Sequence, residues 1–191
     1  YVLSAHGRIV NGVNATWGPA RPQGIPTAAA TLGGFDGGVY QYVVTFIDTD
    51  GRESGTSLTN KITLMDSQGI AFSDKPVGGS DIASVNIYIP QPSSKNLYLA
   101  VTISNGTTTV TVTDSRFAIP LGTQLLDLMP SGQIVRHFAG RVLVAKDNVL
   151  WYSDPFGYHL CNLNKNFMVF PERITMVEPV TNGLYVSADK T

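Results

Sequence analysis

The chain of 191 residues is long enough for one large or two small domains with a sizeable core. Its net charge of −1 gives no electrostatic reason to expect specific nucleic-acid binding or attraction to an acidic membrane, and no apolar run approaches the ~20 residues that a membrane-spanning helix needs. A single cysteine, Cys161, excludes an internal disulfide framework, and the 14% of charged residues is typical of a surface covered by neighbours or of an extracellular protein.

The first 26 residues predict a β-hairpin and a connector. Residues 1–4 look like the end of a strand, and a short strand is expected at residues 8–10 between turns at His6-Gly7 and Asn11-Gly12. Residues 17–26 hold three prolines and two glycines, which exclude a helix or a central strand. We expect this connector to lead into a new module, with Trp17 anchoring it against a neighbour.

The strongest strand pattern lies at residues 39–47, where β-branched and aromatic residues fill nearly every position. Neither face of such a strand is built for water, so we expect both to be covered. Asp48-Thr49-Asp50-Gly51 supplies the residues of a tight turn, and a returning strand is expected at residues 58–64.

This region, GGVYQYVVTFIDTDGRESGTS at residues 37–57, resembles the last hairpin of fibronectin type III-like modules. In those modules a Tyr-x-Tyr-x-Val strand leads into an Asp-x-x-Gly-x-Glu-Ser turn. The resemblance implies an antiparallel β-sandwich and no chemistry of its own. The hairpin normally closes the domain in that family but lies near its start here, which implies a permuted strand order.

Further strands are predicted on both sides of this hairpin. A first strand is expected at residues 27–32, and alternating apolar residues predict others at 70–72, 85–89 and 97–103. Asn105-Gly106 predicts a hairpin turn with a returning strand at residues 107–113. About seven strands between residues 27 and 116 match the number in a fibronectin-like sandwich, which we place at residues 27–118. Residues 119–133, rich in proline and glycine, are expected to be a linker with at most one helical turn.

The last third, residues 134–191, predicts an antiparallel meander. Strands are expected at residues 140–145, 149–153, 174–179 and 184–188, with a loop up to Phe170. The segments GRVLVAKDNVLWYSDP and NFMVFPERITMVEPVTNGLYVSADKT resemble the repeat of tail nozzle proteins of short-tailed phages and of related uncharacterised tail proteins. In those proteins an Arg-led strand, a Trp/Tyr-Ser strand and a Phe before a loop build propeller blades.

This second resemblance covers about residues 134–191, with residues 1–14 as candidate closing strands of an earlier blade. It implies that the sandwich is an insertion into a β-propeller-like region. The chain opens within one expected strand and stops just after another, so we expect it to belong to a longer protein.

Two groups of residues suggest metal sites but lack complete ligand sets. Asp48, Asp50 and Glu53 begin like a calcium loop, which also needs a third ligand pair and a later bidentate Glu. His137, His159 and Cys161 are soft donors, but zinc needs a fourth ligand and closer paired spacing. We therefore expect turn chemistry and ordinary structure here, with no metal and no cofactor.

The sequence predicts no enzyme. Ser153-Asp154 lies near His159 in sequence without the Gly-x-Ser-x-Gly elbow of serine hydrolases, and Cys161 has no helix N-terminus or basic cluster beside it to lower its pKa. A converging pair of acids, as in glycosidases, stays possible in space, but nothing singles one out.

We therefore predict an all-β structural protein of a phage virion, located in the tail. It would form a homo-oligomeric ring around the genome-ejection channel, next to other tail or head-tail connector proteins. One alternative is an extracellular carbohydrate-binding or adhesion module in which Trp17, Trp151, Tyr158 and Tyr185 stack on sugar rings, although packing is the commoner use of such aromatics. Another is an accessory segment of a β-propeller enzyme whose acids lie in other blades.

Overall fold

The computed structural model describes residues 2–4, 7–10, 13–91 and 94–189. Every regular element among them is a β-strand, and every pairing between named strands is antiparallel, which confirms the predicted all-β class. No helix in this described part is long and apolar enough to cross a membrane. The predicted turn residues His6, Asn11 and Gly12 lie outside the described residues.

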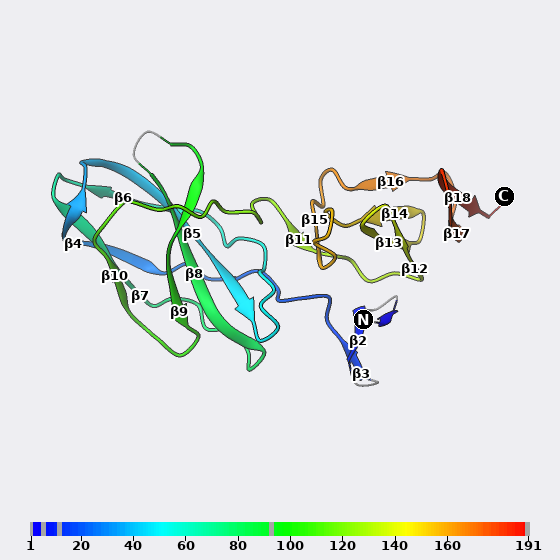
Figure 1. Ribbon diagram of the computed structural model, residues 1–191, viewed down its shortest axis with the longest axis horizontal. Coiled ribbons are helices and arrows are strands. Elements are labelled where there is room, and N and C mark those ends of the chain that lie inside the picture. The colour runs from blue at the N-terminus through cyan, green and yellow to red at the C-terminus, as the bar shows by residue number, and fades with distance from the viewer. Residues whose placement is uncertain (1, 5–6, 11–12, 92–93, 190–191) are drawn as a thin grey trace. The chain divides into compact units, whose positions relative to one another are not determined.

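The chain forms two compact units, and most of their strands are labelled in Figure 1. The insert unit comprises Pro19–Leu125. The split unit combines Tyr1–Gly18 with Leu126–Thr191, so residues from both ends of the chain belong to it.

Among the described residues, the insert unit holds seven strands in two sheets. The sequence predicts about seven strands for this region. One sheet has the order β6-β5-β8-β9, and the other has the order β10-β7-β4. The strands are β4 (Thr27–Phe35), β5 (Gly38–Asp48), β6 (Asn60–Leu64), β7 (Gln68–Ser73), β8 (Ile82–Pro90), β9 (Leu97–Ser104) and β10 (Val110–Val112).

The two sheets contribute to one hydrophobic core, because alternate residues of each strand point toward it. β5 supplies the most prominent members, and the Tyr42 ring lies edge-on to Phe72 of β7 at 5.1 Å. The hydroxyl of Tyr42 donates a hydrogen bond of 2.9 Å to the carbonyl of Pro26, which satisfies the one polar atom of a side chain only 1% exposed. The buried members are Phe35, Tyr40, Tyr42, Val44, Phe46, Leu64, Ile70, Phe72, Ile82, Val85, Ile87, Ile89, Ile103 and Val112.

The chain segment between β5 and β6 differs from the prediction. The strand expected from residue 58 begins at Asn60, and the preceding segment is fastened to β5 by two serines. The amide of Ser57 donates to the carbonyl of Val44, and its Oγ accepts from the Val44 amide at 3.0 Å. Ser54 makes the same pair of bonds with Phe46. Serine hydroxyls thus substitute for a regular ladder partner, which hydrophobic alternation alone cannot reveal.

The predicted hairpin between β9 and the strand near residue 110 is wrong. β10 pairs with β7 in the opposite sheet, with Val110 opposite Phe72. Asn105 explains the change of direction, since its Oδ1 accepts from the Gly78 amide and its Nδ2 donates to the Gly78 carbonyl. Lys75 Nζ also donates to the Asn105 carbonyl at 2.6 Å. These contacts hold the turn against the loop before β8 and direct the chain to the other sheet.

The described residues of the split unit form four short sheets. The first sheet holds β1 (Val2–Ser4), β2 (Gly7–Val10) and β3 (Val13–Ala15), and the second pairs β11 (Asp127–Leu128) with β15 (Leu160–Cys161). The third sheet holds β12 (Ile134–Phe138), β13 (Arg141–Lys146), β14 (Val149–Tyr152) and β16 (Phe167–Val169). The fourth pairs β17 (Ile174–Val180) with β18 (Gly183–Ala188). The sequence did not predict β3, β11, β12, β15 or β16, and β15 and β16 occupy the segment that we expected to be a loop.

The third of these sheets, in the order β12-β13-β14-β16, has two differently covered faces. On one face Leu143, Ala145 and Leu150 pack against Ile174 and Val177 of the β17-β18 hairpin. On the other face Val142 and Val144 pack against Trp17, Met129 and Cys161. A sheet and a hairpin are therefore stacked face to face through apolar side chains.

The segment between the two units makes backbone contacts of its own. The amide of Leu99 donates to the carbonyl of Ile119, and the amide of Leu121 donates to the carbonyl of Leu97, so residues 119–121 run beside β9. Residues 127–128 pair with β15, opposite Cys161 and Leu160.

Candidate functional site

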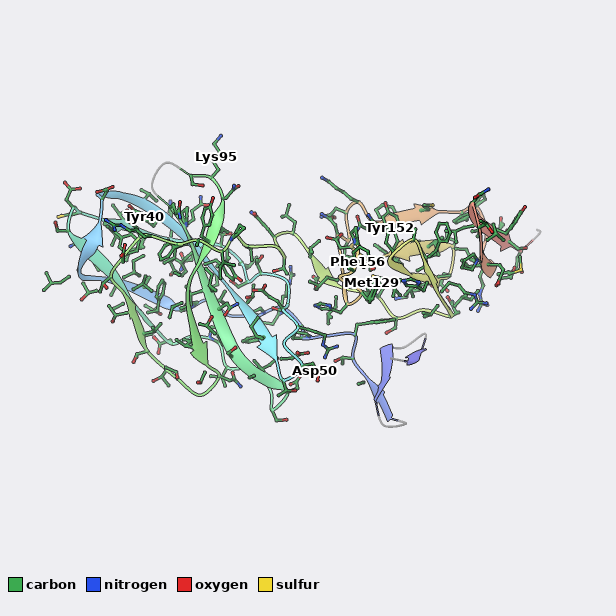
Figure 2. All side chains as sticks on the ribbon, viewed as in Figure 1. Tyr40, Asp50, Lys95, Met129, Tyr152 and Phe156 are labelled. Carbon is green, nitrogen blue, oxygen red and sulfur yellow. The ribbon has the colours of Figure 1, made fainter. Side chains whose placement is uncertain are left out.

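In the acidic turn after β5, whose Asp50 is labelled in Figure 2, the carboxylates of Asp48 and Glu53 accept hydrogen bonds from other groups of the protein. Asp48 Oδ1 accepts from the amides of Asp50 and Arg52, at 3.0 and 2.8 Å, and Asp48 Oδ2 forms an ion pair with the Arg52 guanidinium. Glu53 points toward β8 instead. The three acids therefore do not converge, and the arrangement favours the turn chemistry that we expected over a calcium loop.

Glu53 belongs to a polar network on the face of the β6-β5-β8-β9 sheet that points away from the core. Its Oε1 accepts from the Tyr88 hydroxyl at 2.7 Å, from Thr45 Oγ1 at 2.5 Å and from Asn86 Nδ2 at 3.3 Å. Thr102 Oγ1 donates to Asn86 Oδ1 at 2.7 Å. Burial, together with the hydrogen bond to Glu53, raises the pKa of Tyr88, so this phenol stays neutral. The network ties the turn to the sheet.

The soft donors of the split unit lie in three different environments. His137 is exposed on β12, with its ring edge-on to Tyr158 at 5.5 Å. His159 is half-buried beside Gly18, and Cys161 is fully buried in the cluster with Trp17 and Met129. Among the described residues, no group of three or more His, Cys, Asp or Glu side chains is placed to hold a metal ion.

The hydroxyl of Ser153 is hydrogen-bonded to the backbone on both sides. Its Oγ accepts from the Val142 amide at 3.0 Å and donates to the Asp154 carbonyl at 2.9 Å, and the residue is 0% exposed. Asp154 accepts from Asn166 Nδ2 at 2.9 Å instead of orienting a histidine. Burial raises the pKa of the Cys161 thiol to about 12, and the charges of Asp127 and Asp154 add to the effect. A protonated, buried thiol is a poor nucleophile.

The aromatic residues proposed for sugar stacking do not form one platform. Trp17 is 5% exposed and packs in the core of the split unit, close to Met129, which Figure 2 labels. Trp151 is half-buried, Tyr158 contacts His137, and Tyr185 on β18 is 66% exposed. Trp17 therefore contributes to packing, as the commoner use of aromatics predicts.

One apolar surface of the split unit lies on the four-stranded sheet. It comprises Val149, Trp151, Phe167 and Val169, with Lys146 beside them, and we call it the open patch. The residues adjoin across the strands, because Trp151 is opposite Phe167 and Val149 is opposite both Lys146 and Val169. The Trp151 and Phe167 rings are 5.3 Å apart, and Val169 is 61% exposed. Such a patch on a sheet is typical of an interaction surface.

A second apolar surface lies on the β17-β18 hairpin. Ile174, Val177, Leu184 and Val186 face the sheet, whereas Met176, Glu178, Val180 and Tyr185 face outward and form what we call the outer hairpin face. Tyr185 is opposite Glu178 in the register. The two named surfaces therefore lie on opposite sides of the stack formed by the sheet and the hairpin.

Sequence reasoning missed Phe167 and Val169, because residues 167–170 follow an Asn-rich segment and precede Pro171, a context typical of loops. The only available signal was the run of four apolar residues.

The chain matches no family model and no curated protein sequence.

Proposed function

We propose that this chain is a structural component of a phage virion, a tail or nozzle protein that acts by assembling around the genome-ejection channel. Its neighbours are further copies in a homo-oligomeric ring and other tail or head-tail connector proteins. The proposal assigns no catalytic step and no cofactor to the chain.

The observation that carries the proposal is the open patch, an apolar sheet face of the kind that assembly covers. The stack of sheet and hairpin supports it further. A four-stranded antiparallel sheet followed by a hairpin packed on its face resembles the packing of successive propeller blades. The low charge of the chain is consistent with surfaces that lie between subunits.

We further propose that the insert unit is a fibronectin type III-like sandwich carried by the propeller-like split unit. Two sheets with seven strands around one core support this assignment. The grouping of residues 1–18 with residues 126–191 supports the view that the sandwich is an insertion.

Quantitative peptide mass spectrometry tests the proposal. Particles from the phage whose genome encodes the chain would be purified on a density gradient. Peptides of this chain are expected to follow the portal and tail proteins through the gradient at a fixed ratio of several copies per particle. Peptides found only in the soluble fraction, with none in intact particles, would contradict the proposal.

A second candidate function, carbohydrate binding, is favoured by one observation. The Trp151 and Phe167 rings form a tilted, partly exposed pair, which is the type of surface that stacks on sugar rings. A glycan array would show selective binding that Trp151→Ala abolishes. Binding to no glycan, or binding unchanged by Trp151→Ala, would eliminate this candidate.

A further inference from the structure

We propose that a second copy of this chain covers the open patch with its outer hairpin face, so that copies stack head to tail. The inference rests on the proposed function and names the surfaces that the subunits use. Its starting point is a contact inside the molecule, where the inner face of the β17-β18 hairpin already covers one face of the four-stranded sheet.

The same sheet offers a comparable apolar face on its other side. There Val142 and Val144 are covered by Trp17 and Met129, but the coverage ends toward the edge strand β16. Phe167 is 37% exposed and Val169 is 61% exposed. The exposed part is a continuation of a face that is already packed, so a further layer would extend an existing core.

The outer hairpin face has the composition to be that layer. Met176, Val180 and Tyr185 are 45%, 40% and 66% exposed, although hairpins this short usually keep their solvent side polar. An aromatic ring on each surface, Tyr185 on one and the Trp151-Phe167 pair on the other, supplies the anchor that interfaces favour.

The charges of the two surfaces are complementary. Lys146 is exposed beside the open patch, opposite Val149 in the register. Glu178 is exposed on the outer hairpin face, opposite Tyr185, where its carboxylate also reaches Arg136 at 3.4 Å. Contact between two open patches would bring two Lys146 ammonium groups together, whereas contact with the outer hairpin face brings Lys146 to Glu178, whose charge Arg136 partly balances. Charge therefore favours contact between the unlike surfaces.

Because the two surfaces are different and lie on opposite sides of the stack, the contact is heterologous. Each copy uses its hairpin on one neighbour and its open patch on the other, which generates a closed ring or an open filament. A patch-to-patch contact would instead stop at a dimer.

The experiment compares the whole chain with two variants that each remove one surface. Phe167→Glu places a charge in the open patch, and Tyr185→Glu places one in the outer hairpin face; both side chains are exposed enough for the fold to survive. Sedimentation velocity is expected to show wild-type species larger than a dimer, growing with concentration. Each variant is expected to weaken this association at least about tenfold, as the removal of a central aromatic anchor does.

Mixing the two variants gives the decisive result. Phe167→Glu retains a working hairpin and Tyr185→Glu retains a working patch, so an equal mixture has one intact contact and should form a 1:1 dimer that does not grow. Met168→Glu is the matched control, because Met168 lies on the opposite face of the same edge strand and is 49% exposed. It should associate like the wild type, and circular dichroism would verify that all variants are folded.

Any one of the following results would overturn the inference. These are a wild type that stays a single chain at all concentrations, a Tyr185→Glu variant that associates normally, and a mixture that gives no dimer. Loss of association in Met168→Glu would indicate pairing through the edge of β16 and would also overturn it. A chain that is monomeric in solution yet present in virions would end this inference alone, whereas a self-associating chain absent from virions would end only the proposed function.

Discussion

The Tyr88 hydroxyl on β8 donates a hydrogen bond of 2.7 Å to Glu53 Oε1, which lies in the segment that follows the turn after β5. Tyr88 is 3% exposed, so the phenol and the carboxylate meet where water is largely excluded. The bond fastens the Asp-Gly-Arg-Glu-Ser segment to the outer face of the sheet. The segment that resembles the fibronectin-type turn is thus used here for structural attachment.

Tyr88→Phe is expected to lower the free energy of unfolding by about 1–2 kcal/mol, because a charge-assisted hydrogen bond to Glu53 is lost in a buried setting. Urea denaturation measures the change. Tyr98→Phe on the neighbouring strand β9 is the matched control, and since its ring is half-exposed the expected change is below about 0.5 kcal/mol. Equal effects of the two substitutions would show that the network contributes nothing.

Ser57→Ala is expected to cost about 1–3 kcal/mol of stability, because the amide of Val44 would lose the acceptor Ser57 Oγ while both residues remain buried. Ser104→Ala, at an exposed position of β9, provides the comparison and should change stability by less than about 0.5 kcal/mol. Native-state hydrogen exchange at the Val44 amide would report the loss directly. Unchanged protection there would argue against the assigned role of Ser57.

The sequence predicts the long strands of the insert unit well, because β5 is an almost unbroken run of β-branched and aromatic residues and apolar residues alternate along β8. It fails where a side chain replaces a ladder bond. The irregular return through Ser54 and Ser57 and the turn held by Asn105 depend on contacts with residues distant in the sequence, which period-two alternation does not encode. Two- and three-residue strands such as β15 and β16 are too short to show any period.

Asp48→Asn is expected to destabilise the protein by about 1–3 kcal/mol, since Asp48 is 4% exposed and pairs with Arg52. Calcium is expected to leave the Tm of the wild type unchanged, because the Asp48 oxygens are already engaged by the Arg52 guanidinium and by two backbone amides. Calorimetry with calcium and with EDTA measures this. A calcium-dependent rise in Tm that Asp50→Asn abolishes would revive the calcium-loop hypothesis.

Stability is expected to fall at alkaline pH through Cys161. Its thiol has a pKa raised from 9.0 to about 12 by burial, so the native state keeps a proton that the unfolded chain loses above pH 9. This contribution is therefore fully present below pH 9 and is lost as the pH rises toward 12. Unfolding free energies measured across this range should fall more steeply for the wild type than for Cys161→Ala. Parallel curves would contradict the assignment.

The same burial predicts the reactivity of Cys161. At pH 8 an aromatic disulfide reagent is expected to label the thiol only as fast as the split unit unfolds, because a buried thiol presents little thiolate. Labelling in denaturant provides the control for full reactivity. Rapid labelling of the native chain would show that the cluster around Trp17 and Met129 is open.

The candidate site was only partly accessible to sequence reasoning. The sequence marks Trp151 and Tyr185 as aromatics that function could use, but nothing in it separates them from Trp17, which packs in the core. The partners Phe167 and Val169 become visible only once β16 is paired with β14. Which face of a sheet is covered depends on elements far away in the chain, and that information is tertiary.

The proposal that this chain is part of a phage tail is tested most directly by immunogold electron microscopy with antibodies raised against the purified chain. Gold particles are expected at the tail of intact particles, at a site surrounding the ejection channel. Gold distributed over the capsid, or absent from intact particles that a portal antibody labels, would contradict the proposal.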